Sequence, residues 1–148
     1  METQLKIPKF NMIKSNPKDY YLCFKIFEEN MKEIIENNEE WNENKFEESF
    51  NTREIRIIYD KKSKTNIGFF QIKYKKGLTF IKKIQIQKEF QNKGFESEIL
   101  KIILKEAKEK NLPKLQLKKF QNNPSIKLYE DFGFRITKKL NSSYIMEL

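Results

Sequence analysis

The stretch from Ile84 to Ala107, IQIQKEFQNKGFESEILKIILKEA, constrains the fold of this chain more than any other. Ile84 and Ile86 alternate with glutamines in the period-two pattern of a strand, and the apolar residues after Gly94 recur at helical spacing. Between them, QNKG is a polar turn whose glycine can adopt positive φ. The stretch therefore predicts a buried strand, a tight turn and an amphipathic helix in direct succession.

This turn is suited to binding phosphate. The first N–H groups of a helix have no partner within the helix, and the helix dipole makes that end positive. Lys93 adds a mobile cation beside them. The turn therefore favours a site for a cofactor that contains a diphosphate. Glycine-containing turns before helices are common, so the inference needs a second motif.

The second motif is NNPSIKLYEDFGF, residues 122–134, which follows the short strand KLQLKKF. Together the two segments resemble the GNAT superfamily of acetyl-CoA-dependent N-acetyltransferases. The family loop Gln/Arg-x-x-Gly-x-Gly/Ala falls on Gln91, Gly94 and Glu96. The family pattern Asn-x-x-Ala-x-x-Leu-Tyr-x-x-x-Gly-Phe falls on Asn122, Ser125, Leu128, Tyr129, Gly133 and Phe134. The resemblance covers about the last eighty residues well and the first seventy loosely.

The resemblance implies one α/β (mixed α+β) domain spanning residues 1–148. Its central sheet would be twisted, mixed and mostly antiparallel, with flanking helices and a parallel pair of strands that splays apart at the acyl-CoA site. Acetyl-CoA would bind as co-substrate, and no metal is implied. The residues assigned to the cofactor are Ile84, Gln85, Ile86, Gln91, Asn92, Lys93, Gly94, Phe95, Glu96, Ser97 and Asn122.

The resemblance also implies a mechanism. The acceptor amine would attack the thioester directly, without an acyl-enzyme, while backbone N–H groups near residues 84–86 polarise the carbonyl. Tyr129 would be the general acid that protonates the departing thiolate; the alternative is that it only packs beside the cofactor. The general base stays open between Glu89 and an acceptor-side glutamate acting through water.

Glu96 departs from the family pattern, which keeps glycine or alanine there so that the backbone can approach the pyrophosphate. A carboxylate at this position would repel a diphosphate unless the side chain turned into solvent. A non-catalytic acyl-CoA-binding protein is therefore an alternative reading of the chain.

The composition excludes several kinds of chemistry. The chain has no histidine, so Ser-His-Asp and Cys-His catalysis and His-ligated metal sites are excluded. Its single cysteine, Cys23, lies among aromatic residues, which favours a buried structural thiol over a nucleophile. No run of eighteen apolar residues and no signal-peptide core are present, so a soluble cytoplasmic protein without membrane contact is expected.

The net charge of +9 is unevenly distributed. Residues 28–48 contain nine glutamates and two lysines, a net charge of −7, whereas residues 49–148 carry +13. This asymmetry predicts a primary amine as the acceptor, small or peptide-borne, with Glu28, Glu29, Glu33 and Trp41 as candidate acceptor-binding residues. The alternative is a solvated helix face. A basic nucleic-acid-binding module is disfavoured because the positive charges are scattered, and a homodimer is left open.

Three strands joined by short turns are predicted at residues 53–60, 67–76 and 78–87. The helix at 93–110 leads from the last of them to a strand at 114–120, and this crossover requires the two strands to be parallel. The remaining predicted elements are a strand at 7–14, a helix starting at 15–17, a shorter helix around Trp41, Phe46 and Phe50, a short helix at 124–132, and a final hairpin of RITKKL and SSYIMEL.

Overall fold

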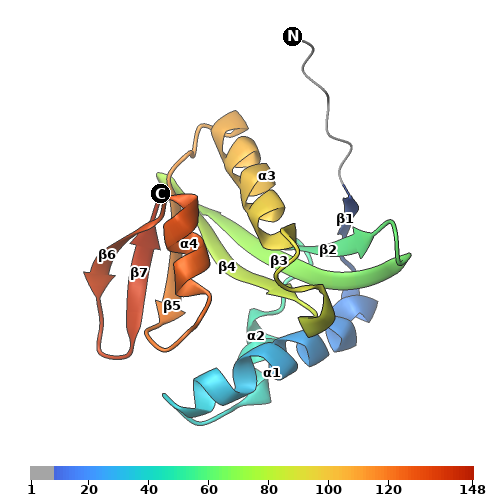
Figure 1. Cartoon of the computed structure of the whole chain (residues 1–148), viewed down its shortest axis with the longest axis horizontal. Coiled ribbons are helices and arrows are strands. Elements are labelled where there is room, and N and C mark those ends of the chain that lie inside the picture. The colour runs from blue at the N-terminus through green and yellow to red at the C-terminus, as the bar shows by residue number, and fades with distance from the viewer. Residues whose placement is uncertain (1–8) are drawn as a thin grey trace.

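The computed structural model describes residues 9–148, which form a seven-stranded sheet and four α-helices (Figure 1). The strands are β1 (Phe10–Lys14), β2 (Ile55–Asp60), β3 (Thr65–Lys75), β4 (Leu78–Ile86), β5 (Leu115–Phe120), β6 (Arg135–Lys139) and β7 (Ser143–Glu147). The helices are α1 (Tyr20–Glu36), α2 (Glu43–Ser49), α3 (Phe95–Glu109) and α4 (Ile126–Phe132), with short 3-10 turns η1 (Pro17–Asp19) and η2 (Lys88–Phe90).

The strands are ordered β1-β2-β3-β4-β5-β7-β6 across the sheet. Every neighbouring pair is antiparallel except β4 and β5, which are parallel and joined by α3. The predicted single domain with a mixed, mostly antiparallel sheet and flanking helices is confirmed. The strand predicted at 7–14 is β1 from Phe10 onward, and residues 7 and 8 lie outside the described part of the chain.

The parallel pair separates after a short contact. β4 and β5 pair only where Thr79 to Ile81 face Leu115 to Leu117. On the other side of β4, Gln71 pairs with Lys83 and Ile72 with Ile81, so Lys82 is an extra residue that forms a β-bulge. A bulge bends its strand, and beyond this one β4 and β5 diverge (Figure 1). The predicted splay is therefore present, and we call the gap between the two strands the splay.

Two cores cover the two faces of the sheet. Helices α1 and α2 pack Cys23, Phe24 and Phe46 against Ile57 and Phe69. Helices α3 and α4 pack against the other face of the sheet, because successive strand residues point to opposite faces. The core on this side contains Ile99, Leu100, Ile103 and Tyr129. Cys23 is fully buried, and burial raises the pKa of its thiol to about 12. The prediction of a structural thiol is confirmed.

Local sequence signals explain where α1 begins. Asn16 and Asp19 form a capping box around η1: the Asn16 side chain accepts from the Lys18 N–H, and the Asp19 carboxylate accepts from the Asn16 N–H. Helix α1 then continues to Glu36 with one apolar face against the sheet. None of the helices formed by residues 9–148 has the length and apolarity needed to span a bilayer.

Candidate active site

The turn before α3 has the backbone geometry of an anion-binding loop. Asn92 has φ 60° and Gly94 has φ 88°, both in the left-handed region. Within residues 9–148 the backbone N–H groups of residues 92–97 have no hydrogen-bond acceptor, and the first helical bond joins the Glu98 N–H to the Gly94 carbonyl at 3.2 Å. Six free donors at the positive end of a fifteen-residue helix favour an anion.

Side-chain amides hold this turn against the end of β4. The Ile86 carbonyl accepts from Gln91 Nε2 at 2.9 Å and from Asn30 Nδ2 at 2.8 Å. Asn30 Nδ2 also donates to Gln85 Oε1 at 3.1 Å. The network joins α1, β4 and the turn. Gln91 was expected here, whereas Asn30 was not, because nothing in the sequence of α1 distinguishes it from the neighbouring polar residues.

The free edge of β4 presents backbone donors to the splay. The Gln87 N–H donates to the Ile67 carbonyl at 2.8 Å, toward β3. Successive residues of a strand direct their backbone groups to opposite sides, so the N–H groups of Ile84 and Ile86 point away from β3. The Ile86 carbonyl, which accepts from two side chains and not from β3, agrees with this direction. The splay therefore has two strand N–H groups along one wall.

A cavity of about 290 Å³ lies between the turn, the splay and α4, and we call it the α3 cavity. Of the residues expected at the cofactor, it is lined by Ile84, Gln85, Ile86, Gln91, Asn92 and Glu96, and also by Tyr129. Lys93 and Gly94 are exposed beside it. Phe95 packs on Phe10 and Phe90 instead. The structure thus brings the two sequence motifs to one cavity.

Tyr129 is only 1% exposed, and its ring packs edge-on against Phe134. Its hydroxyl has no hydrogen-bond partner in the described part of the chain. Burial, and to a smaller extent the charge of Glu96, raises the pKa of the phenol. Tyr129 is therefore protonated at neutral and mildly alkaline pH, with a donor available to a group in the α3 cavity.

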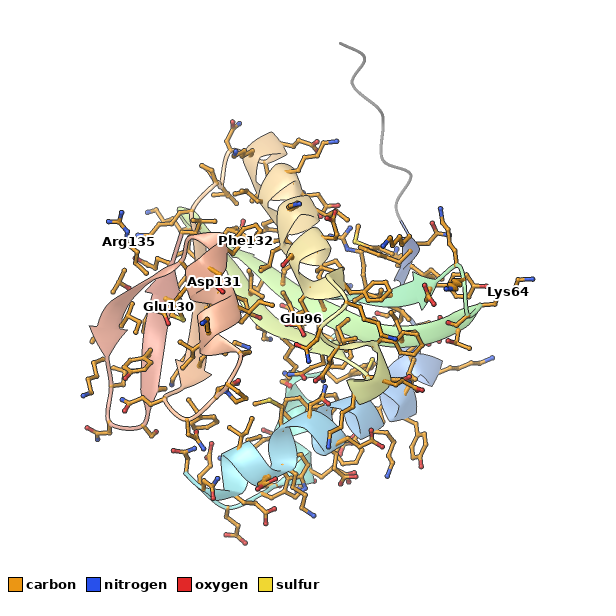
Figure 2. All side chains as sticks on the ribbon, in the orientation of Figure 1. Lys64, Glu96, Glu130, Asp131, Phe132 and Arg135 are labelled. Carbon is orange, nitrogen blue, oxygen red and sulfur yellow. The ribbon has the colours of Figure 1, made fainter. Side chains whose placement is uncertain are left out.

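Glu96 faces into the α3 cavity and not into solvent. Figure 2 shows it at the N-terminal end of α3, on the side toward β4 and α4. Burial raises the pKa of its carboxyl, an effect that Lys119 of β5 opposes. The Lys119 ammonium lies 4.9 Å from the centroid of the Tyr129 ring, and burial lowers its pKa to about 8. A half-buried carboxylate and a half-buried ammonium thus share this wall without forming an ion pair.

The turn before α4 is held by Asn123 and not by Asn122. Asn123 Oδ1 accepts from the Ser125 N–H at 2.9 Å and from Ser125 Oγ at 2.7 Å, and Asn123 lines the α3 cavity. Asn122 is exposed, and its side chain accepts from Asn38 Nδ2 at 3.0 Å, which links the loop after β5 to the end of α1. The sequence motif points to the correct turn, but the side chain that caps it is the next residue.

A second hollow, of about 600 Å³, lies beside α1, and we call it the α1 cleft. It shares Met31, Gln85, Lys119 and Asn123 with the α3 cavity, so the two hollows meet at the splay. A smaller hollow of about 250 Å³, the Trp41 pocket, adjoins the α1 cleft through Phe27, Ile35, Glu39 and Lys83. A molecule in the α1 cleft would therefore have access to a group held in the α3 cavity.

The structure does not bring the expected acidic residues to these hollows. Glu28, Glu29 and Glu33 line neither the α3 cavity, the α1 cleft nor the Trp41 pocket. Glu29 and Glu33 are exposed on α1, and Glu28 pairs with Lys25 at 3.3 Å. Trp41 does line its pocket and stacks on Phe27. Glu89 is exposed outside all three hollows.

The mixed sheet, its splayed parallel pair and the turn at the head of α3 together define an acyl-CoA-dependent acetyltransferase fold. Residues 19–134 match the model of the acetyltransferase (GNAT) family, and the chain belongs to this family. It is therefore an acetyltransferase that uses acetyl-CoA as co-substrate. No curated protein matches the sequence significantly.

Solved structures support the fold. The PaiA N-acetyltransferase from Thermoplasma acidophilum, solved with coenzyme A, is 18% identical, with a TM-score of 0.74 over 93% of this chain and 97% of that chain. The ribosomal-protein-S18-alanine N-acetyltransferase from Escherichia coli is 16% identical, with a TM-score of 0.72 over 94% and 92%. A GNAT acetyltransferase from Bacillus anthracis is 20% identical, with a TM-score of 0.71 over 97% and 96%.

Proposed function

We propose that this enzyme transfers the acetyl group of acetyl-CoA to a primary amine by direct attack in a ternary complex. The observation that carries the proposal is the meeting of the α3 cavity and the α1 cleft at the splay. A thioester held on one side of this opening could be reached by an amine from the other, with no need for a covalent enzyme intermediate. The single thiol is not an activated nucleophile, because Cys23 is buried and its pKa is raised.

The residues of the α3 cavity fit acetyl-CoA. The free N–H groups of residues 92–97 suit the diphosphate, and Lys93 adds an exposed cation beside them. The N–H groups of Ile84 and Ile86 suit the amide and thioester carbonyls of the pantetheine arm. Glu96 is the one group that does not suit an anion, and Lys119 partly offsets its charge.

The chemistry requires one bond exchange and three proton transfers, the last of which restores Tyr129. The amine nitrogen forms a bond to the acetyl carbon, and the carbon–sulfur bond breaks. The leaving thiolate takes a proton from the Tyr129 hydroxyl, and the nitrogen releases a proton to water, from which Tyr129 is reprotonated. A backbone N–H of Ile84 or Ile86 stabilises the negative charge that develops on the carbonyl oxygen. The products are an N-acetyl amine and coenzyme A.

The test is acetyl-CoA-dependent thiol release measured with a panel of primary amines, small and peptide-borne. Mass spectrometry of each product would show whether the acetyl group is on nitrogen. We expect amine-dependent thiol release and an acetamide product. Thiol release that does not depend on the amine, or no release with any amine at millimolar concentration, would contradict the proposal.

A further inference from the structure

The α1 cleft has a strong excess of positive charge. Its wall contains Lys82, Lys83, Lys118 and Lys119 but one acidic residue, Glu39. Lys82 is neutralised by Glu54 at 2.9 Å, and Glu39 is neutralised by Lys45 at 2.7 Å. The other three lysines form no ion pair with any carboxylate in residues 9–148. The cleft therefore holds two ammonium groups with no carboxylate partner, Lys83 and Lys118, while the charge of Lys119 is partly offset by Glu96.

These cations come from both strands of the splay. Ile84 and Ile86 of β4 and Leu115 and Leu117 of β5 belong to the core under α3 and α4. Strand alternation therefore directs Lys83 and Lys118 to the α1 side of the sheet. Lys119 points to the α3 cavity, where it faces Glu96 and Tyr129. The α1 cleft is thus flanked by Lys83 from one strand and Lys118 from the other.

Lys83 is held in place without a carboxylate. Its ammonium donates to Ser49 Oγ at 2.9 Å and to Gln71 Oε1 at 3.5 Å, and it lies 5.5 Å from the centroid of the Phe27 ring. Burial and then Lys82 lower the pKa of this ammonium to about 8, against the opposing effect of Glu54. A half-buried cation with neutral partners gains from any anion that enters the cleft. Lys118 is exposed and adds a mobile second cation.

We propose that the acceptor is a small primary amine that also carries an anionic group, a carboxylate or a phosphate, bound between Lys83 and Lys118 while its amine reaches the splay. This inference rests on the function proposed above and adds the chemical class of the acceptor. A cleft of about 600 Å³ is within the usual size of small-molecule sites. The same lysines would repel polyamines, so the cleft would also discriminate against acceptors that carry a second ammonium group.

Four amines of similar length test the class directly: ethanolamine, β-alanine, phosphoethanolamine and putrescine. Their second groups are neutral, carboxylate, phosphate and ammonium respectively. We expect kcat/KM for the better of the two anionic amines to exceed that for ethanolamine by about tenfold or more, because the anionic group adds a charge-assisted hydrogen bond that ethanolamine lacks. Putrescine should be the poorest. The ranking of β-alanine against phosphoethanolamine identifies the anion.

Two variants locate the anion site. Lys118→Gln and Lys83→Met should each raise KM for the preferred anionic amine about fivefold or more and leave KM for acetyl-CoA and for ethanolamine nearly unchanged. Because Lys118 is exposed, Lys118→Gln should fold normally and can be measured even if Lys83→Met folds poorly. Lys105→Gln is the matched control, since Lys105 is exposed on α3 outside the hollows and its loss changes the net charge equally.

The outcomes separate this inference from the proposed function. Turnover with all four amines at similar kcat/KM, or with putrescine preferred, would overturn the inference and leave amine acetylation standing. An equal effect of Lys118→Gln and Lys105→Gln would also overturn it, since the charge would then act only at long range. The absence of turnover with every amine would overturn both proposals, because the anionic amines are the acceptors that the inference requires.

Discussion

At the scale of single residues, the α3 cavity depends on three side chains that face one another: Glu96, Lys119 and Tyr129. Tyr129 and Glu96 were expected from the motifs, whereas Lys119 was not. In a chain with thirty lysines and arginines, no sequence signal separates one lysine from the rest. Its importance comes from its position beside a carboxylate on α3 and an aromatic ring on α4, because only the tertiary fold brings these two elements to β5.

Replacing Tyr129 by phenylalanine tests its role as general acid. The ring would keep its packing on Phe134, so affinity for acetyl-CoA should be retained, while loss of the hydroxyl proton should lower the single-turnover rate by about a hundredfold or more. Rapid-quench measurement of acetyl transfer gives this rate. Tyr144→Phe on β7 is the control and should behave as wild type. An unchanged rate in Tyr129→Phe would remove Tyr129 from the mechanism.

Replacing Glu96 by glutamine removes a charge from the wall of the α3 cavity and should tighten binding of acetyl-CoA. The carboxylate lies in the first turn of the helix whose free N–H groups suit the diphosphate. We expect Kd to fall by about threefold to tenfold in calorimetric titration at low salt. Glu98→Gln, in the same first turn but paired with Lys101, is the control. A folded Glu96→Gln protein that binds more weakly would show that the carboxylate contributes to binding.

Replacing Lys83 by methionine should stabilise the fold. The pKa of Lys83 is about 8 in the native state, below its ordinary value of 10.5, because of burial and Lys82. Between these two pH values the unfolded chain binds more protons than the native protein, so the free energy of unfolding rises with pH. Below pH 8 Lys83 is charged in both states, and the full cost of burying its charge is present. We expect about 1–2 kcal/mol of stabilisation at pH 7.

Thermal unfolding at pH 7 and pH 10 measures this effect, and the gain should shrink at the higher pH. A gain of the same size at both pH values would mean that packing, and not charge, is responsible. A loss of stability at pH 7 would mean that the hydrogen bonds from Lys83 to Ser49 and Gln71 outweigh the burial of its charge. If Lys83→Met is more stable but binds the acceptor more weakly, Lys83 lowers the stability of the fold in exchange for a functional contact.

At the scale of elements, the hydrophobic pattern and turn residues were sufficient to predict the order of the strands and helices and the parallel pairing of β4 with β5. The second helix was misplaced at its ends, because Trp41 and Phe50 flank α2 and only Phe46 is in it. The splay was predictable only through the family resemblance. Its local cause is one extra residue, Lys82, and a one-residue bulge leaves no mark on an alternating pattern as short as that of β4. The amide network from Asn30 was equally hidden, since it joins positions 55 and 56 residues apart.

Replacing Gly68 on β3 tests how closely β3 must approach the end of β4 at Gln85 and Ile86. A Cβ there would collide with the Gln85 carbonyl oxygen and lie 3.1 Å from Ile86 Cα, both of them backbone atoms. Gly68→Ala should therefore displace the end of β4, lower stability by about 2–4 kcal/mol and weaken acetyl-CoA binding. Chemical denaturation and calorimetric titration measure the two effects.

Gly77→Ala is the control for this substitution. A Cβ at Gly77 would meet no atom within 4 Å, but its φ of 80° is unfavourable for alanine. We expect a loss of about 1 kcal/mol from the backbone alone, with acetyl-CoA affinity unchanged. If Gly68→Ala matched this small loss and bound acetyl-CoA normally, the end of β4 would not need the close approach.

At the scale of the whole molecule, the arrangement of charge differs from the one that sequence predicted for the acceptor side. The acidic stretch was expected to face an amine, yet Glu29 and Glu33 lie on the exposed side of α1. Glu39 of the same stretch does line the α1 cleft, but it is paired with Lys45. Lysines from β4 and β5 line the cleft beneath that helix instead. Net charge along the chain does not determine which face of a helix turns toward a cleft, because that depends on how α1 packs against the sheet.

We propose that acetyl-CoA occupies the α3 cavity with its thioester at the splay, open to an amine in the α1 cleft. The most direct measurement is a crystal structure of the enzyme with coenzyme A. We expect the diphosphate on the N–H groups of residues 92–97, the pantetheine arm along Ile84 and Ile86, and the thiol within hydrogen-bond distance of the Tyr129 hydroxyl. Coenzyme A bound outside the splay, or with its thiol turned away from Tyr129 and the α1 cleft, would contradict this proposal.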